Sequence, residues 1–592
     1  MLAVAPAGPV GSVVYEWRLD DDASRSPRAR FERGRSLRSL AGVDLLARGG
    51  CSFAEAAIAG VVLVGAAFAA FGAHVADGGF ELDDWSWAAQ HQSAGGFFAF
   101  AGDLLGTSLS YAGTRPGEAV YFTVMYGLFG SNPAGHIAVT VALAGLMSMA
   151  VYCVLRTLGM ERLHAGAIGL LLVLFPATDA DRLWLTVGYA HIAICLYACG
   201  LLCTLRAFRL SGRRALAWHV AGVVLYGASF LTYEIAVGGV LLTVLVYRFR
   251  TDWRTALRRW VADLALLIPA GLYDHHTKGA SFSLGHIFHQ GRTIAHQAWT
   301  LLTRLGIQTG PARLPAYVIV LLVVAAAGAV FLVPLAEDAR RPLRRWLAIC
   351  AGGVIVVGAG YVPFLGSNSF YLPLRPGFGN RTNFGAAAGF VIVIYALAVL
   401  AGRLVALAPG LRRRREASVS VAAVVTAAGV ATVAGLWANQ IRDDRLTWDR
   451  ARTVNDRTLA AVRRAGKPPS GSPIYTFGVP GTTAPFVFTF SVSWDLTGAV
   501  QLLWHDPTLH GVPSPSIAPS FVNVNDPSLA GNTPANSGFA CRRRDVRPRG
   551  WLYYDRDASP YGKTLFVDVP RRRSALVRDR RTCLAWAARE LG

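Results

Sequence analysis

The chain has 592 residues, of which 53% are hydrophobic and only 16% charged, and its formal net charge is +22. A soluble chain of this length would carry roughly a quarter charged residues. The excess of basic residues does not indicate a nucleic-acid partner, because the arginines gather in short links between long apolar runs, where they set the orientation of a membrane protein. The composition therefore excludes an ordinary soluble protein and indicates a membrane domain followed by a more polar one.

The first 50 residues are polar and rich in arginine and glycine. No apolar segment of the kind found in a signal peptide precedes residue 54. We predict a mostly disordered cytoplasmic tail over residues 1–50. The alternative is a small amphipathic surface helix around Phe31–Leu46.

Between residues 54 and 437, apolar runs alternate with short charged links. Runs of ~20 residues match the ~30 Å hydrocarbon core of a bilayer. Every second link is rich in arginine, so the positive-inside rule places the N-terminus in the cytoplasm and the C-terminus outside. We predict a mainly α, polytopic membrane protein with about eleven transmembrane helices. The predicted spans are 54–76, 134–155, 163–177, 185–205, 215–231, 233–247, 260–275, 315–335, 346–366, 384–408 and 417–437.

Two of these segments are predicted to be helical hairpins. Residues 215–247 have an Arg-rich link at both ends, so the chain must enter the membrane and return, with Thr232–Glu234 at the outer tip. Runs 163–177 and 185–205 form a similar hairpin with Ala177–Trp184 at its tip. Short paired spans often border a water-filled cavity or a thin part of the protein.

We predict three regions: the tail over 1–50, a transmembrane domain over 51–440 and a small extracytoplasmic α/β domain over 441–592. Cys541 and Cys583 are the only cysteines of the last region, and an oxidising compartment would permit a disulfide between them. The alternative is that both stay reduced. The expected elements are a helix over 443–465, a strand near 473–478, a helix near 497–505, strands near 551–555 and 563–568, and a closing helix over 571–590.

An acidic segment, Glu81–Trp87, follows the first predicted span. Its two indoles suit a membrane interface, whereas the adjacent carboxylates of Asp83 and Asp84 repel each other and have no structural reason to lie there. A carboxylate at the rim of a membrane cavity can act as a general base. The alternative is a solvated loop or a helix N-terminus, because aspartate is a good capping residue.

Further short motifs follow the acidic pair. They are Arg-Pro at 115–116, Phe-Gly-Ser-Asn at 129–132, Tyr-Glu at 233–234 and Arg-Pro-Gly-Phe-Gly-Asn-Arg at 375–381. Together with the acidic pair, these motifs make residues 54–410 resemble the GT-C superfamily of glycosyltransferases. These are multi-spanning enzymes that take a sugar from a polyprenyl-phosphate carrier. The family carries an acidic motif in its first outer loop, where Asp83 and Asp84 stand.

The resemblance implies that Asp83 or Asp84 takes a proton from an acceptor hydroxyl while an outer cation stabilises the leaving phosphate. Arginine suits phosphate through its fork of donors, and interfacial snorkelling is the alternative role for these residues. A lone acid in an apolar hairpin usually faces a polar cavity or a partner. The expected substrate- and phosphate-binding residues are Arg115, Glu234, Lys278, Arg375 and Arg381, with Arg292 as a further candidate.

Asp179 and Asp181 lie in the second outer link. The resemblance implies another acidic position near this place, which holds a metal in some members. Capping of the next helix is the alternative. His286 and His289 are three residues apart, but no HExxH or similar metal signature is present. We therefore expect no metal site and no other cofactor, although the second acidic position leaves a divalent cation open.

The sequence thus predicts a transferase of the plasma or inner membrane. Its expected partners are a polyprenyl-phosphate sugar, membrane lipid and an extracytoplasmic acceptor, which is a cell-envelope glycan, a lipid or a protein. Two alternatives stay open. A polysaccharide polymerase or ligase would rely on late outer arginines such as Arg375 and Arg381. A transporter of lipid-linked sugars would show repeat symmetry, which is not evident here.

Overall fold

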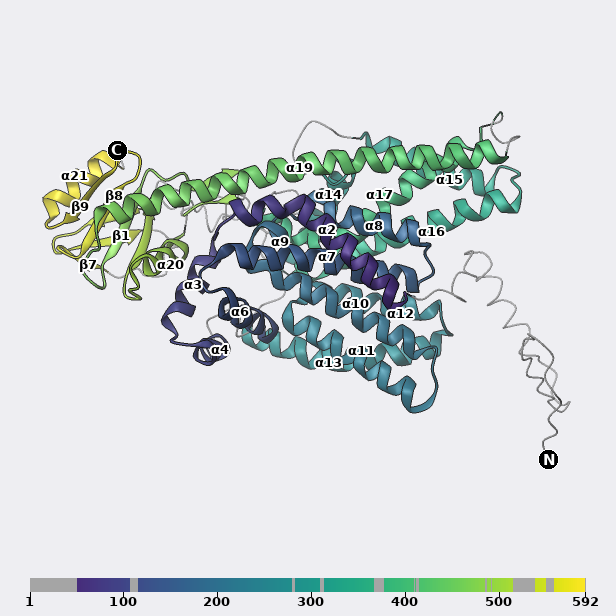
Figure 1. The fold of residues 1–592 in the computed structure, drawn as a ribbon, viewed down its shortest axis with the longest axis horizontal. Helices are drawn as coiled ribbons and strands as arrows, with labels where there is room; N and C mark the ends of the chain where they lie inside the picture. Colours follow the sequence, from purple (N-terminus) through teal and green to yellow (C-terminus); the bar gives the residue numbers. More distant parts are fainter. Residues whose placement is uncertain are drawn as a thin grey trace. The chain divides into compact units, whose positions relative to one another are not determined.

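The computed structural model describes residues 51–106, 115–278, 283–308, 314–366, 377–408, 410, 415–484, 487–490, 492–514, 538–549 and 558–590. The predicted tail over 1–50 and the strand near 551–555 lie outside these residues. The described part is mainly helical and ends in a small α/β region (Figure 1).

Seven helical segments among the described residues are long and apolar enough to cross a membrane, as expected of a multi-pass membrane protein. Their starts follow from local sequence. Ser52 accepts a hydrogen bond from the Glu55 amide, and Asn132 caps Ala134 with Pro133 at the first helical position. These segments contain α2 (Phe53–Asp77), α7 (Pro133–Thr157), η3 with α10 (Leu185–Gly188, Tyr189–Ala207), α11 (Gly212–Thr232), α16 with η5 (Glu337–Tyr361, Val362–Phe364), η6 with α17 (Gly377–Asn383, Phe384–Val405) and α19 (Arg415–Ala465).

The remaining predicted runs also form helices, which are shorter or carry more charge. The helices are interrupted at both predicted hairpin tips, where the chain was expected to turn back into the membrane. The first tip contains η2 (Pro176–Thr178) and α9 (Ala180–Leu183), and the second contains η4 (Glu234–Ala236). The additional helices are α8 (Arg162–Leu174), α12 (Val237–Arg248), α13 (Trp253–Lys278) and α15 (Ala316–Phe331).

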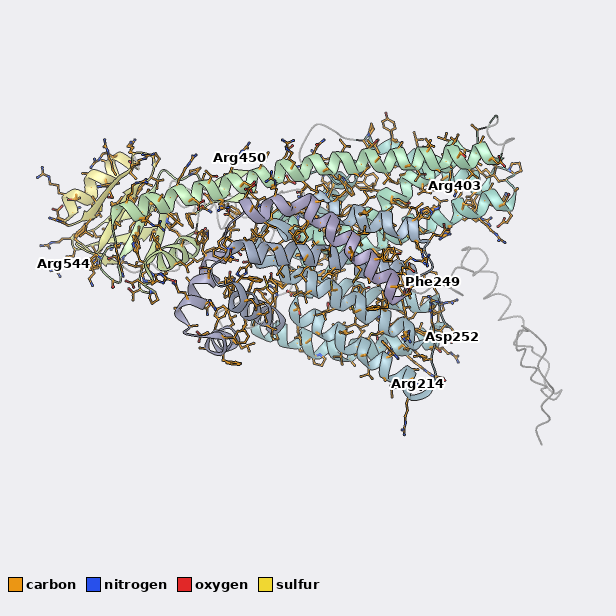
Figure 2. All side chains as sticks on the ribbon, viewed as in Figure 1. Arg214, Phe249, Asp252, Arg403, Arg450 and Arg544 are labelled. Carbon is orange, nitrogen blue, oxygen red and sulfur yellow. A yellow bond between two sulfur atoms is a disulfide. The ribbon has the colours of Figure 1, made fainter. Side chains whose placement is uncertain are left out.

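The Arg-rich links gather at one end of the helices. Arg250 donates to the carbonyl of Thr157 across 2.7 Å, and Arg345 pairs with Glu161 at 3.3 Å. Figure 2 shows Arg214, Asp252 and Arg403 at this end, whereas Arg544 lies in the C-terminal region at the other end. The alternation of charge along the sequence therefore corresponds to two chemically different ends of the bundle.

The opposite end carries short helices from the outer segments. Three of them follow α2, and the first of the three packs on the C-terminal region (Figure 1). They are α3 (Asp83–Ser93), α4 (Phe97–Gly106) and α6 (Pro116–Phe129); a fourth, α14 (Leu284–Thr303), follows α13.

The predicted last span and the predicted helix over 443–465 form one continuous helix, α19, of 51 residues. At ~1.5 Å per residue it extends for about 75 Å. It contacts α17 and α2 along one part and strands of the C-terminal region along another. The expected boundary near residue 440 therefore falls inside an unbroken helix.

The C-terminal region is built on a four-stranded sheet with the order β4-β1-β8-β9. Strand β1 is parallel to β4 and to β8, whereas β8 and β9 are antiparallel. The strands are β1 (Pro473–Phe477), β2 (Thr482–Ala484), β3 (Val487–Phe488), β4 (His510–Ser514), β5 (Gly538–Cys541), β6 (Asp545–Arg549), β7 (Ser559–Pro560), β8 (Thr564–Asp568) and β9 (Arg573–Val577), with helices α20 (Ser493–Trp504) and α21 (Arg580–Glu590).

The predicted disulfide is confirmed, because Cys541 is bonded to Cys583. The predicted closing helix over 571–590 is wrong in its first part, where β9 returns antiparallel to β8 and only α21 is helical. Pairing with the buried strand β8 outweighs the helical preference of this segment. Arg572, in the turn between the two strands, has a φ of 53°.

Candidate active site

The acidic pair begins helix α3 directly after a strained residue. Leu82, the N-cap, is buried and has a φ of 48°, a conformation that is costly for a branched side chain. Asp83 and Asp84 occupy the first turn, where the helix dipole favours negative charge. The two carboxylates leave the helix in different directions and have different environments.

Asp84 is fully buried and holds two segments together. One oxygen accepts from the Thr186 amide at 2.9 Å and from its hydroxyl at 2.5 Å, and the other accepts from the Glu81 amide at 2.9 Å. Burial raises the pKa of Asp84 to about 8 in spite of these donors. Asp84 thus fixes the start of α3 to the tip of the first hairpin.

Asp83 is half-buried rather than buried, and one of its oxygens accepts a hydrogen bond from the indole of Trp494 at 2.7 Å. Burial raises the pKa of the Asp83 carboxyl, while the Trp494 indole and the charge of Arg381 oppose the rise. A partly exposed carboxylate with a raised pKa has the properties of a general base. Of the predicted pair, Asp83 is therefore the candidate for chemistry and Asp84 the support.

Arg381 has the surroundings expected of the predicted phosphate-binding cation. Its guanidinium carbon lies 4.1 Å from the ring centre of Phe378 and 5.7 Å from that of Trp184. Its charge favours the ionised forms of both Asp83 and Asp181. Stacking on two aromatic faces fixes the plane of the guanidinium.

A second charged group lies beside Asp83. Arg115 makes a bidentate pair with Glu234 at 2.8 and 2.9 Å and a longer contact with Glu118 at 3.4 Å. Its guanidinium also lies 4.7 Å from the ring centre of Tyr233. Burial raises the pKa of Glu118 to about 7, although Arg115 lowers it, and Asp83 adds to the rise. Arg115 and Glu234 therefore fix α6 to the second hairpin tip.

The two aspartates of the second acidic position have different environments. Asp179 accepts from the Trp448 indole at 2.8 Å and from the Gly377 amide at 3.3 Å, so it joins the first hairpin tip to α19 and η6. Asp181 is fully buried, and neither of its oxygens has a hydrogen-bond partner among the described residues. Burial raises the pKa of Asp181, and the charges of Arg182 and Arg381 oppose the rise.

The remaining predicted side chains either lie outside the described residues or are exposed on α14. Arg375 lies outside the described residues, as does the side chain of Lys278. Arg292, His286 and His289 are exposed on α14. In the described part of the chain, no group of three or more His, Cys, Asp or Glu side chains is placed to hold a metal ion.

Sequence reasoning missed three residues of the site. Glu118 lies two residues after the Arg-Pro motif, and its position as an acid in an aromatic helix was the available signal. Tyr189, at the start of α10, is buried and interacts electrostatically with Glu118, Arg115 and Arg381. Trp494 lies 411 residues after Asp83, so no local pattern identifies the pair.

The C-terminal region completes this site by packing directly on α3. A Cβ on Gly498 would lie 2.4 Å from the carbonyl oxygen of Trp85, so the two helices approach to backbone contact. Asn455 of α19 donates to Glu81 at 2.8 Å and accepts from the Phe490 amide at 2.9 Å. The acidic segment is therefore held from the membrane side and from the C-terminal side.

No protein-family model matches the chain, and no curated protein sequence is similar to it.

Proposed function

We propose that the protein is a membrane glycosyltransferase that moves a sugar from a polyprenyl-phosphate donor to an extracytoplasmic acceptor. The observation that carries the proposal is the half-buried Asp83 carboxylate, which interacts with the aromatic-stacked cation Arg381. A base and a cation near one another meet the two needs of transfer from a phosphate leaving group.

In the proposed reaction, an acceptor hydroxyl attacks the anomeric carbon of the donor sugar. Asp83 takes the proton of that hydroxyl as the new carbon–oxygen bond forms. The bond between the anomeric carbon and the phosphate oxygen breaks, and the electron pair leaves with the polyprenyl phosphate. Arg381 stabilises the negative charge on that phosphate. Arg115 and Glu234 hold Glu118 and the second hairpin tip around the reacting groups.

The proposal includes an orientation in the membrane. We infer about eleven spans with the Arg-rich end in the cytoplasm and the site outside. Two observations support this orientation: the gathering of Arg-rich links at the end opposite the C-terminal region (Figure 2) and the Cys541–Cys583 disulfide, which fits an oxidising compartment.

The test is consumption of lipid-linked sugar by the purified protein in lipid nanodiscs. Candidate polyprenyl-phosphate sugars are supplied with a cell-envelope glycan extract, and release of polyprenyl phosphate is measured. We expect Asp83→Asn to lower the rate about 10²- to 10⁴-fold. Asp103→Asn on α4, a second carboxylate of the same outer segment, serves as the matched control and should keep its activity.

Three outcomes would contradict the proposal. The first is full activity of Asp83→Asn at normal protein level. The second is absence of donor consumption for every lipid-linked sugar supplied. The third is movement of intact lipid-linked sugar across the bilayer without its cleavage, which would identify a transporter instead.

A further inference from the structure

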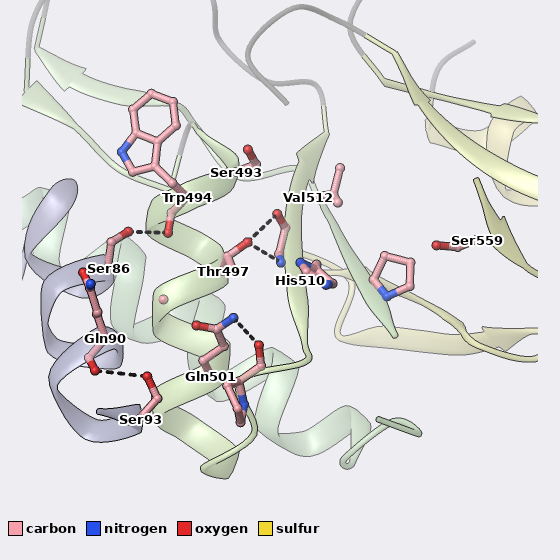
Figure 3. Close-up of a pocket in the computed structure, with 14 residues that line it drawn as sticks. Ser86, Gln90, Ser93, Ser493, Trp494, Thr497, Gln501, His510, Val512 and Ser559 are labelled. Atoms are coloured by element: carbon pink, nitrogen blue, oxygen red, sulfur yellow. Dashed lines mark hydrogen bonds between the residues drawn. The ribbon is translucent and has the colours of Figure 1, made fainter. Parts of the chain in front are cut away.

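A cavity of about 400 Å³ lies next to the candidate site, between α3 of the outer segment and the C-terminal region. We call it the α3–α20 cavity. Ser86, Gln90 and Ser93 line it from α3, Thr497 and Gln501 from α20, and residues of β4 and β7 from the far side (Figure 3). Its volume falls within the ~300–1,000 Å³ range of small-molecule sites.

The walls of this cavity combine hydroxyl and amide groups with the apolar side chains of proline, tryptophan and valine. Among the described residues that line it, the polar side chains are those of serine, threonine, glutamine and histidine, and none is lysine, arginine, aspartate or glutamate. This composition is unusual in a chain with a net charge of +22. A phosphate or carboxylate would find no cation there, and an ammonium group would find no carboxylate. A purely apolar ligand would leave the hydroxyl and amide groups of the walls without water or partners.

Hydrogen bonds hold the walls in place and leave some polar groups for a ligand. The Thr497 hydroxyl accepts from the Gly511 amide at 2.8 Å, and Gln501 donates to the carbonyls of Pro507 and Leu509. The side-chain amide of Gln90 has no hydrogen bond to another described residue, nor does the amide oxygen of Gln501. The cavity therefore offers donors and acceptors from a pre-formed frame, which suits a ligand rich in hydroxyl groups.

Three residues that line the cavity lie on the same face of α3 as Asp83. Asp83, Ser86, Gln90 and Ser93 follow one another at spacings of three, four and three residues, which is one face of an α-helix. The face runs for about 15 Å. Trp494 contacts two residues of this face. The carbonyl of Trp494 accepts from the Ser86 hydroxyl at 2.8 Å beside the cavity. The indole of Trp494 points away from Thr497 and Gln501 (Figure 3) and donates to Asp83.

We propose that the α3–α20 cavity binds an uncharged glycan segment and delivers one of its hydroxyl groups along α3 to Asp83. The acceptor of the reaction is then a neutral polysaccharide or oligosaccharide rather than a protein or an anionic lipid. The delivery step rests on the function proposed above, whereas binding of the neutral glycan does not.

The test measures binding without any donor. The purified full-length protein is titrated with neutral tetrasaccharides built from hexoses or pentoses, and with uronic-acid tetrasaccharides as the anionic comparison. Binding is followed by saturation-transfer nuclear magnetic resonance. We expect binding of at least one neutral tetrasaccharide and at least tenfold weaker binding by Gln90→Leu. Ser559→Phe narrows the cavity from the other wall and should weaken binding as well.

Gln92→Leu is the matched control, because Gln92 lies on α3, contacts His505 of the C-terminal region and does not line the cavity. Its affinity should stay within twofold of the wild type.

Equal losses of affinity in Gln90→Leu and Gln92→Leu would overturn the proposal. Preference for the uronic-acid tetrasaccharides, or no binding of any neutral tetrasaccharide, would overturn it as well. Binding without donor consumption would end the transferase proposal alone. Transfer with an unchanged acceptor KM in Gln90→Leu would end the cavity proposal alone.

Discussion

The indole of Trp494 donates a 2.7 Å hydrogen bond to the carboxylate of Asp83, which lies 411 residues earlier in the chain. The bond joins the C-terminal region to the first outer helix at the group proposed to carry out the chemistry. It also stabilises the ionised form of that carboxylate.

Replacement of Trp494 by phenylalanine removes the donor and keeps most of the ring. The pKa of Asp83 should rise further, because one interaction with the charged form is lost. Since the base must be ionised, the acid limb of the pH–rate profile should move to higher pH. Trp504→Phe, in the same helix α20, should leave the limb where it is in the wild type. An unmoved limb in Trp494→Phe would remove Asp83 as the titrating base.

Asp84→Asn should act on stability rather than on the proton transfer. An asparagine amide would face the Glu81 amide or the Thr186 donors, so one donor loses its acceptor. The expected loss in the free energy of unfolding is about 1–3 kcal/mol. Asp83→Asn keeps an acceptor for Trp494 and should unfold close to the wild-type temperature. Thermal unfolding in detergent, compared between the two variants, checks this difference.

The stability of the protein should fall as the pH rises from about 5 to about 8. Burial raises the pKa of Glu118 to about 7 and that of Asp84 to about 8, above their ordinary values of 4.5 and 3.8. The folded protein therefore retains protons that the unfolded chain releases in this range, and each rise in pH favours unfolding. Glu118→Gln removes one of these titrations and should flatten the dependence. Unfolding temperatures measured across the range test it, and a parallel curve for the variant would contradict it.

The Arg115–Glu234 pair should show strong coupling. Its side chains are 16% and 21% exposed, and its two hydrogen bonds are parallel. A double-mutant cycle with Arg115→Met and Glu234→Leu is expected to give a coupling free energy of about 1–3 kcal/mol. The Arg341–Glu337 pair, with side chains 73% and 51% exposed, is the control and should give less than about 0.5 kcal/mol. Equal values would mean that the first pair does not hold the hairpin tip.

The positions of several helices and of the breaks between them could be read from the sequence because they depend on local patterns. Arginines on both sides of residues 215–247 required a turn, and the helices are interrupted at Tyr233, as predicted. The disulfide between Cys541 and Cys583 could be predicted because that region has no other cysteine. The same kind of reasoning failed for residues 573–577, because their strand depends on pairing with β8 rather than on their own pattern.

The different environments of Asp83 and Asp84 could not be read from the sequence. The two residues are identical and adjacent, so nothing local separates them. Thr186 makes one a buried anchor, and Trp494 and Arg381 give the other its electrostatic environment. Both differences come from distant segments, and Glu118 was overlooked because its significance depends on Arg115 and Asp83 in the folded chain.

The unbroken course of α19 has a consequence for biosynthesis. Three residues contact the acidic segment from the C-terminal side, and all of them follow the part of α19 that is apolar enough to cross a membrane: Asn455, Phe490 and Trp494. A ribosome has therefore made almost the whole protein before the acidic segment acquires its final neighbours. Chains that stop before Trp494, or whose last helix fails to insert, lack the Trp494 contact, so the Asp83 carboxylate of an unfinished copy does not reach its final environment.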